Sequence, residues 1–246
     1  MFPFVYEINL AGWFHLVVFG LLIPAGAFIQ WRKFGKPDSS LPNRLLHFQS
    51  TALTIVMLGA LSLMVARWEG LQLFPRVRPS WRAIGAGVLM FIGALAYMRP
   101  RWRRAVERRA RVVYLYMPAN ATERLWWIVV AVLAGVGEEI TWRGVQAGLI
   151  QNLTDSFWLA AIICAMSFGI GHMIQGTRSV IVVVVFALGF HTLVWLSGSL
   201  YVAMAVHIAY DITAGISYGR LGRELGYQLD PGESPAPAPS ITDVNF

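Results

Sequence analysis

The stretch AVLAGVGEEITWRGVQAGL, residues 131–149, decides how the rest of the chain is interpreted. It is an apolar run of helix length that carries two adjacent carboxylates and an arginine in its middle, Glu138, Glu139 and Arg143. Each charged side chain at the centre of a bilayer costs roughly 2.5–3.5 kcal/mol on insertion scales. A membrane helix that keeps three such side chains has to pair them inside the protein or use them in chemistry.

The composition indicates a protein with several membrane-spanning helices. The chain of 246 residues is 57% hydrophobic and only 13% charged, whereas soluble domains have about 25% charged residues. Its net charge of +7 comes mainly from basic residues in short loops between apolar runs, which is the positive-inside bias of membrane proteins, so we expect no nucleic-acid partner. The single cysteine, Cys164, lies in an apolar run, which excludes a disulfide framework and a cysteine metal site.

Seven apolar runs have the length of helices that cross a membrane. They cover about residues 10–29, 46–66, 83–98, 122–149, 157–173, 180–196 and 200–218. We therefore expect an all-α fold, a polytopic membrane helix bundle of about seven transmembrane helices, in one transmembrane domain over residues 1–229. A Pro- and Ala-rich tail over residues 230–246 is predicted to be disordered.

The distribution of lysine and arginine predicts the orientation of the bundle. The linkers after the first and third runs hold eleven basic residues, whereas the linker after the second run holds four. We expect the N-terminus outside and the C-terminus inside, in the cytoplasmic membrane of a prokaryote. For the most basic segment, residues 99–111, two roles stay open: an amphipathic helix lying on anionic headgroups, or a topology anchor.

The helix predicted over residues 131–149, called the motif helix below, carries two acids and an arginine that we expect to have different roles. Glu139 and Arg143 are four residues apart on one helix face, with the acid first, which predicts an intrahelical ion pair. The side chain of Glu138 points about 100° away from that of Glu139 around the helix axis. Its face carries the small residues Ala131, Ala134 and Gly135, where another helix can approach closely. We expect Glu139 to be neutralised by Arg143 and Glu138 to be free to act.

Two later helices each offer one polar face as well. Phe168 and His172 are four residues apart, and so are His207 and Asp211. Buried polar groups need hydrogen-bond partners, so we expect these two polar faces to converge on Glu138 in the folded chain. A carboxylate with a histidine can deprotonate a water molecule, and a second histidine can donate to a developing oxyanion, which would suit hydrolysis of an amide or ester.

Three motifs of the chain, in the order in which they occur, carry a resemblance to a known family. They are EExxxR at residues 138–143, FxxxH at residues 168–172 and HxxxD at residues 207–211. They resemble the CPBP family, which comprises the type II CAAX prenyl endopeptidases and the bacterial Abi proteins, over a core of about residues 122–218. The resemblance implies an intramembrane endopeptidase that acts on a peptide or lipidated-protein substrate among membrane lipids.

The resemblance also implies a role for each motif residue. The residues matching Glu138 and His172 activate water, those matching His207 and Asp211 form the oxyanion hole, and those matching Glu139 and Arg143 support the site. We expect Phe168 to pack beneath His172. The prenyl proteases typically carry Asn where this chain has Asp211, and a charged Asp cannot donate a hydrogen bond. Asp211 must then be protonated, orient His207 or ligate a metal.

Several alternatives stay open at this point. Glu138, His172 and His207 are adequate zinc ligands, so a divalent metal is an alternative to metal-free water activation. The same buried acids and histidines could serve a proton or ion relay, or a non-enzymatic immunity or scaffold protein. Of the remaining histidines, His191 is interpreted as structural or interfacial, and His15 and His47, near the ends of their spans, need no special role.

Overall fold

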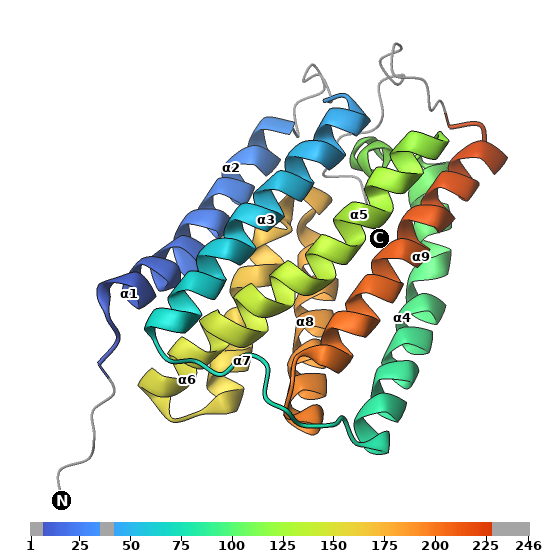
Figure 1. The fold of residues 1–246 in the computed structure, drawn as a ribbon. Helices are drawn as coiled ribbons and strands as arrows, with labels where there is room; N and C mark the ends of the chain where they lie inside the picture. Colours follow the sequence, from blue (N-terminus) through green and yellow to red (C-terminus); the bar gives the residue numbers. More distant parts are fainter. Residues whose placement is uncertain (1–6, 35–41, 228–246) are drawn as a thin grey trace, which may run out of the picture.

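The computed structural model describes residues 7–34 and 42–227, and over these ranges the chain forms seven continuous helices and no strand (Figure 1). The first continuous helix consists of α1 (Leu10–Val17), the π-helical turn η1 (Val18–Leu22) and α2 (Ile23–Phe34), and the fourth consists of α5 (Ala121–Glu138), the π-helical segment η3 (Glu139–Gln146) and α6 (Ala147–Thr154). The other five are α3 (Arg44–Trp68), α4 (Trp81–Glu107), α7 (Phe157–Gly171), α8 (Thr177–Ser197) and α9 (Tyr201–Glu224). Five of the seven are long and apolar enough to cross a membrane. The predicted all-α membrane bundle is therefore confirmed, and the chain is an integral membrane protein.

The helices form two layers around α5 (Figure 1). Helices α1–α2, α3, α5, α9 and α4 follow one another across the front of the view, and α7 and α8 lie behind them. In the front layer α5 packs between α3 and α9, and behind it α7 packs against α8 and α2. The helix that carries the two acids is therefore at the centre of the bundle.

Glycines allow α5 and α9 to approach each other closely. A Cβ atom on Gly135 would lie 2.9 Å from the backbone nitrogen of Ile208, so a side chain there would displace α9. On α9, Gly215 lies against the indole of Trp127, whose Nε1 donates a hydrogen bond to the backbone carbonyl of Asp211 at 2.8 Å. Of the small residues predicted to allow a close approach, Gly135 meets α9, whereas Ala134 belongs to a core shared with α3.

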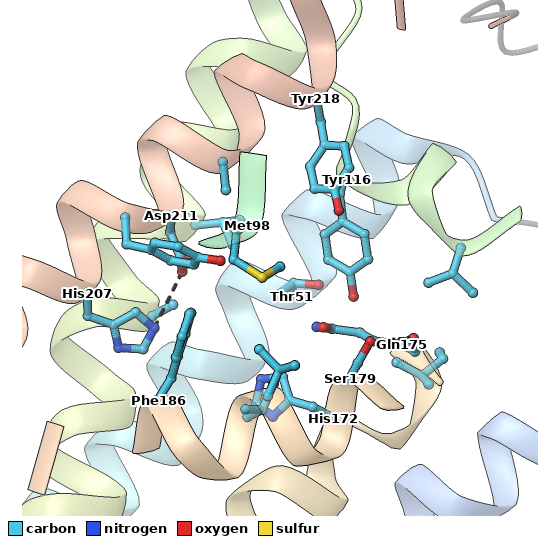
Figure 2. A pocket seen from close by; sticks show the side chains of 18 of the residues that line it. Thr51, Met98, Tyr116, His172, Gln175, Ser179, Phe186, His207, Asp211 and Tyr218 are labelled. Carbon is cyan, nitrogen blue, oxygen red and sulfur yellow. Dashed lines mark hydrogen bonds and ion pairs between the residues drawn. The ribbon is translucent and has the colours of Figure 1, made fainter. Parts of the chain in front are cut away.

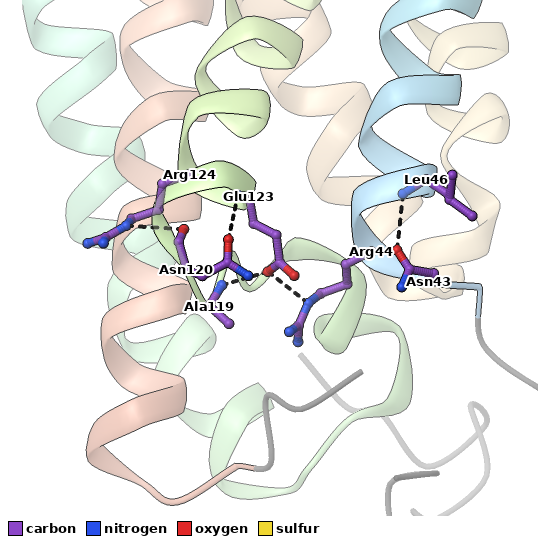
Figure 3. Close-up of polar contacts among 7 residues, drawn as sticks. All are labelled: Asn43, Arg44, Leu46, Ala119, Asn120, Glu123 and Arg124. Atoms are coloured by element: carbon purple, nitrogen blue, oxygen red, sulfur yellow. Dashed lines mark hydrogen bonds and ion pairs between the residues drawn. The ribbon is translucent and has the colours of Figure 1, made fainter. Parts of the chain in front are cut away.

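A buried ion pair joins the first turns of α3 and α5 (Figure 3). Arg44 Nε donates to Glu123 Oε2 at 3.1 Å, and the same oxygen accepts the backbone N–H of Ala119 at 2.8 Å. The Arg44 guanidinium lies over the ring of Tyr114, 4.3 Å from its centroid. Because Asn120 also caps α5 by accepting the backbone N–H of Glu123, the start of the motif helix is fixed by several polar contacts.

Of the two roles left open for residues 99–111, the structure argues against the separate amphipathic helix over residues 99–107. These residues continue α4 as regular helix and do not form a loop or a separate amphipathic helix. The physical reason is the helical spacing of Trp102, Ala105 and Val106, which are buried in a core shared with α9 and the short 3₁₀ helix η2 (Arg111–Tyr116). The predicted tail over residues 230–246 lies outside the described residues.

Candidate active site

A cavity of about 350 Å³ lies between α3, α4, α5, α7, α8 and α9 and is lined by residues of all three motifs (Figure 2). Glu138 contributes from the end of α5, Phe168 and His172 from the end of α7, and His207 and Asp211 from the middle of α9. The volume is in the range of pockets that bind small ligands, about 300–1,000 Å³. The polar faces that the sequence expected to converge therefore share one cavity.

His207 is the centre of the polar contacts on one side of this cavity. Its Nδ1 lies 2.9 Å from Glu139 Oε1, and because an ionised carboxylate can only accept, the imidazole donates this bond. Its Nε2 lies 3.5 Å from Asp211 Oδ2, drawn as the dashed line in Figure 2, and 3.9 Å from Glu138 Oε2. Glu139 therefore holds the ring with Nε2 directed at the two acids that line the cavity.

The predicted ion pair between Glu139 and Arg143 is present. Arg143 Nη1 lies 3.2 Å from Glu139 Oε1, and both side chains are fully buried. The guanidinium lies 4.5 Å from the ring centroid of Phe168 and 5.2 Å from that of Phe190, and Phe190 stacks on His207 at 5.0 Å. Arg143 thus contacts both the carboxylate and the aromatic ring that hold His207.

Adjacent acids at the end of α5 have different environments. The helix becomes π-helical at Glu139, a conformation that is rare and often found at functional sites. The Glu139 side chain is fully buried, whereas 24% of the Glu138 side chain is exposed and borders the cavity. The arrangement gives Glu139 protein partners and leaves Glu138 accessible, as the spacing of the motif suggested.

His172 lies immediately after the last residue of α7. Its Nδ1 lies 2.8 Å from the backbone carbonyl oxygen of Phe168, which can only accept, so Nδ1 donates this bond. The two rings lie 4.4 Å apart between centroids. A neutral imidazole that donates through Nδ1 has a lone pair on Nε2. His172 can therefore accept a proton or a hydrogen bond through Nε2.

A group of uncharged polar side chains lines the wall beyond His172, away from His207 (Figure 2). The group consists of Thr51, Tyr116, Gln175 and Ser179. Ser179 Oγ donates to the backbone carbonyl of Gln175 at 2.9 Å. Burial raises the pKa of Tyr116 to about 12, so its hydroxyl keeps its proton at neutral pH. Sequence analysis did not identify these residues, because they lie outside the three motifs and come together only in the folded chain.

The structure places His15 in a buried polar network. Its side chain is fully buried, and its Nδ1 donates to Gln146 Oε1 at 2.9 Å. Its Nε2 lies 3.0 Å from Ser62 Oγ, which lies 2.9 Å from Thr141 Oγ1. These contacts join the first helix to α3 and η3.

The other two histidines differ in position. His47 lies in the first turn of α3 and lines the cavity. His191 is buried in α8, with its ring 6.3 Å from that of Phe157. His191 does not line the cavity among its described lining residues, whereas His47 is part of the cavity wall.

The zinc alternative does not fit the observed side chains. In the part of the chain that the structure describes, no three His, Cys, Asp or Glu side chains are arranged to hold a metal ion. A catalytic zinc needs three protein ligands at once. Glu138, His172 and His207 border the same cavity, but they do not form such a set.

Comparison with known proteins identifies the part of the chain that carries the motifs. Residues 120–213 match the family model described as Type II CAAX prenyl endopeptidase Rce1-like. The comparisons with curated proteins and with solved structures returned no match. The matched stretch runs from the cap of α5 into α9 and includes all three motifs, so the resemblance drawn from them is confirmed there, while α1–α4 lie outside it.

Proposed function

We propose that this chain, whose residues 120–213 form a type II CAAX prenyl endopeptidase Rce1-like region, is an intramembrane endopeptidase that hydrolyses a peptide bond with activated water. The observation that carries the proposal is one cavity bordered by an accessible acid, Glu138, and two histidines, His172 and His207. Each histidine is held through Nδ1 by another group of the protein, which leaves its Nε2 for chemistry. Such preorganised groups are what general-base hydrolysis requires.

In the proposed reaction Glu138 is the general base. It takes a proton from a water molecule held with the help of His172 Nε2, while the water oxygen forms a bond to the carbonyl carbon of the substrate. The tetrahedral intermediate collapses by breaking the carbon–nitrogen bond, and the proton held by Glu138 passes to the departing amine. The products are a new carboxylate and a new amino terminus, which balances the addition of one water molecule.

His207 is proposed to stabilise the oxyanion of this intermediate. Donation from Nε2 requires a ring that carries protons on both nitrogens, because Nδ1 already donates to Glu139. Asp211 Oδ2 lies 3.5 Å from that Nε2. Of the three roles left open for Asp211, this contact favours orienting His207, since a charged carboxylate cannot itself donate to an oxyanion.

The proposed substrate is a peptide or lipidated protein that enters from the inner side of the membrane. The cavity extends to His47, Arg101 and Tyr116, at the end of the bundle where α4 carries its exposed arginines. By the positive-inside bias this end faces the cytoplasm, with the N-terminus outside and the C-terminus inside, in a prokaryotic cytoplasmic membrane.

Cleavage by the detergent-purified protein tests the proposal. A panel of prenylated and unmodified hydrophobic peptides is incubated with wild type, with Glu138→Gln and with the exposed matched control Glu107→Gln. We expect wild type and the control to cleave at least one peptide and Glu138→Gln to cleave none. Cleavage that persists in Glu138→Gln would refute the assignment of the base, and pH-dependent ion transport in liposomes without cleavage would favour the relay alternative.

A further inference from the structure

A second cavity, of about 190 Å³, lies on the other side of Glu138 and His172. The two cavities share part of their walls. The shared residues are Ile55, Glu138, Phe168, Gly171 and His172. The groups proposed to activate water thus lie at the boundary between two spaces. A peptide bond attacked at that boundary would have one neighbouring residue on each side.

The second cavity is lined mainly by apolar side chains. They are Phe19 and Ile23 of the first helix, Leu58 of α3 and Trp142 of η3, in addition to the shared Ile55 and Phe168. Apart from Glu138 and His172, Thr141 is the one polar side chain among its described lining residues, and its hydroxyl lies 2.9 Å from Ser62 Oγ. Away from the boundary the lining is therefore mostly apolar.

The wall of this second cavity is held by packed rings and by a polar network. Phe19 packs edge-on against Trp142 at 5.5 Å, and Trp142 packs edge-on against Phe168 at 5.5 Å. One turn before Phe19, His15 is bonded to Gln146 and contacts Ser62. Phe19 and Trp142 both lie in π-helical segments, η1 and η3, and both line the space. The cavity is thus a formed site and not a packing defect between loosely placed helices.

The volume defines the size of the ligand. An apolar cavity of about 150 Å³ in another protein binds benzene, so about 190 Å³ accommodates a group of the size of a Leu, Met or Phe side chain. We propose that the second cavity binds the apolar side chain of one of the two substrate residues that flank the scissile bond. This inference rests on the proposed function and deepens it, because it assigns side-chain specificity to residues outside the Rce1-like stretch.

Substitutions at Leu58 test the assignment through specificity. Peptides that differ only at the residues flanking the scissile bond, with Ala, Leu, Phe or Asp there, are cleaved by wild type, Leu58→Phe and Leu58→Ala. We expect wild type to prefer Leu or Phe over Ala at one flank by about 10- to 200-fold in kcat/KM. Leu58→Phe, which fills the cavity, should remove most of this preference, and Leu58→Ala should shift it towards Phe. Met98→Phe, which narrows only the larger cavity, is the matched control and should keep it.

Crosslinking tests occupancy without requiring turnover. A peptide with a diazirine analogue of leucine at either flank is irradiated with the Glu138→Gln protein, and the labelled residues are mapped by mass spectrometry. Labels on residues 19–23 or on Leu58 from one flank support the inference, even if wild type cleaves nothing and the proposed function fails. Labels confined to the larger cavity from both flanks, or a preference that Leu58→Phe leaves intact, would overturn the inference while leaving the proposed hydrolysis standing.

Discussion

Two buried pairs of a glutamate and an arginine stabilise this bundle, and they differ in what surrounds them. In the first, Arg44 and Glu123 join the start of α3 to the start of α5, and a backbone N–H and a tyrosine ring complete their contacts (Figure 3). In the second, Glu139 and Arg143 lie in η3, and the same carboxylate also accepts a hydrogen bond from His207. The second pair thereby contacts a titratable ring, His207, that borders a cavity.

A buried ion pair therefore does not by itself indicate a functional site. Removing one partner of a buried pair is costly at either place, because a charge is left without compensation. What distinguishes the η3 pair is that its carboxylate orients His207 towards Glu138 and Asp211. We therefore expect the Arg44 pair to contribute to stability alone and the Glu139 pair to contribute to both stability and turnover.

The largest expected effect on turnover comes from Glu138→Gln. Removal of a general base lowers kcat by about 100- to 10,000-fold, while the amide keeps the size of the side chain at the cavity wall. Peptide cleavage rates measure turnover, and a thermal melt in detergent measures the stability of the fold. A loss of turnover accompanied by an equal loss of folded protein would mean that Glu138 is structural and would remove the contrast with Glu123.

Glu139→Gln is expected to affect stability and catalysis together. The variant leaves Arg143 buried without its counter-charge, which costs about 3–5 kcal/mol of stability. It also weakens the orientation of His207, and loss of such an orienting group typically costs about 10- to 100-fold. Per folded molecule, kcat should fall while KM stays close to wild type. An unchanged kcat would show that the contact with His207 has no part in the chemistry.

Glu123→Gln provides the matched comparison at the other pair. We expect a similar loss of stability of about 3–5 kcal/mol, because Arg44 loses a charged partner in a buried position. Turnover per folded molecule should equal that of wild type. Chemical denaturation in detergent and cleavage by the folded fraction measure these effects separately. A drop in kcat comparable with that of Glu139→Gln would break the distinction between the two pairs.

Asp211→Asn is expected to have a smaller effect. The amide keeps the shape of the side chain near His207 Nε2 and can donate a hydrogen bond, so kcat should stay within about tenfold of wild type, the range of one modest interaction. Asp211→Ala, which removes the contact, should be the slower enzyme of the two. If the asparagine variant is as slow as the alanine variant, the negative charge of Asp211 is itself required.

Trp127→Phe is expected to have the smallest effect. It removes the hydrogen bond from the indole to the Asp211 carbonyl but keeps an aromatic ring against Gly215. The expected cost is about 1 kcal/mol of stability, with cleavage nearly unchanged. A large loss of activity with unchanged stability would instead assign Trp127 to the positioning of α9 in the site.

Much of the fold could be predicted from the sequence, because each apolar run of membrane length had to become a helix. The differences arise where side chains meet distant partners. Residues 99–107 stayed helical since Trp102 and its neighbours pack against α9 and η2. The π-helical segment at Glu139 could not be predicted from a pattern of period 3.6.

The candidate site was predictable where it depends on local spacing and not where it depends on tertiary contact. The four-residue spacing predicted the pair of Glu139 and Arg143 correctly. The second partner of Glu139, His207, is 68 residues away in the chain, so no local pattern could indicate it. The partners of His15 could not be predicted for the same reason, because Gln146 and Ser62 come from other helices.

The most direct test of the central claim is peptide cleavage in water labelled with oxygen-18. We expect wild type to place the label in the new carboxyl group of the product, because water is the nucleophile. Glu138→Gln should form no product. Glu123→Gln should still incorporate label per folded molecule. Labelled product from Glu138→Gln at the rate of wild type would contradict the account, since water would then be activated without the acid that borders both cavities.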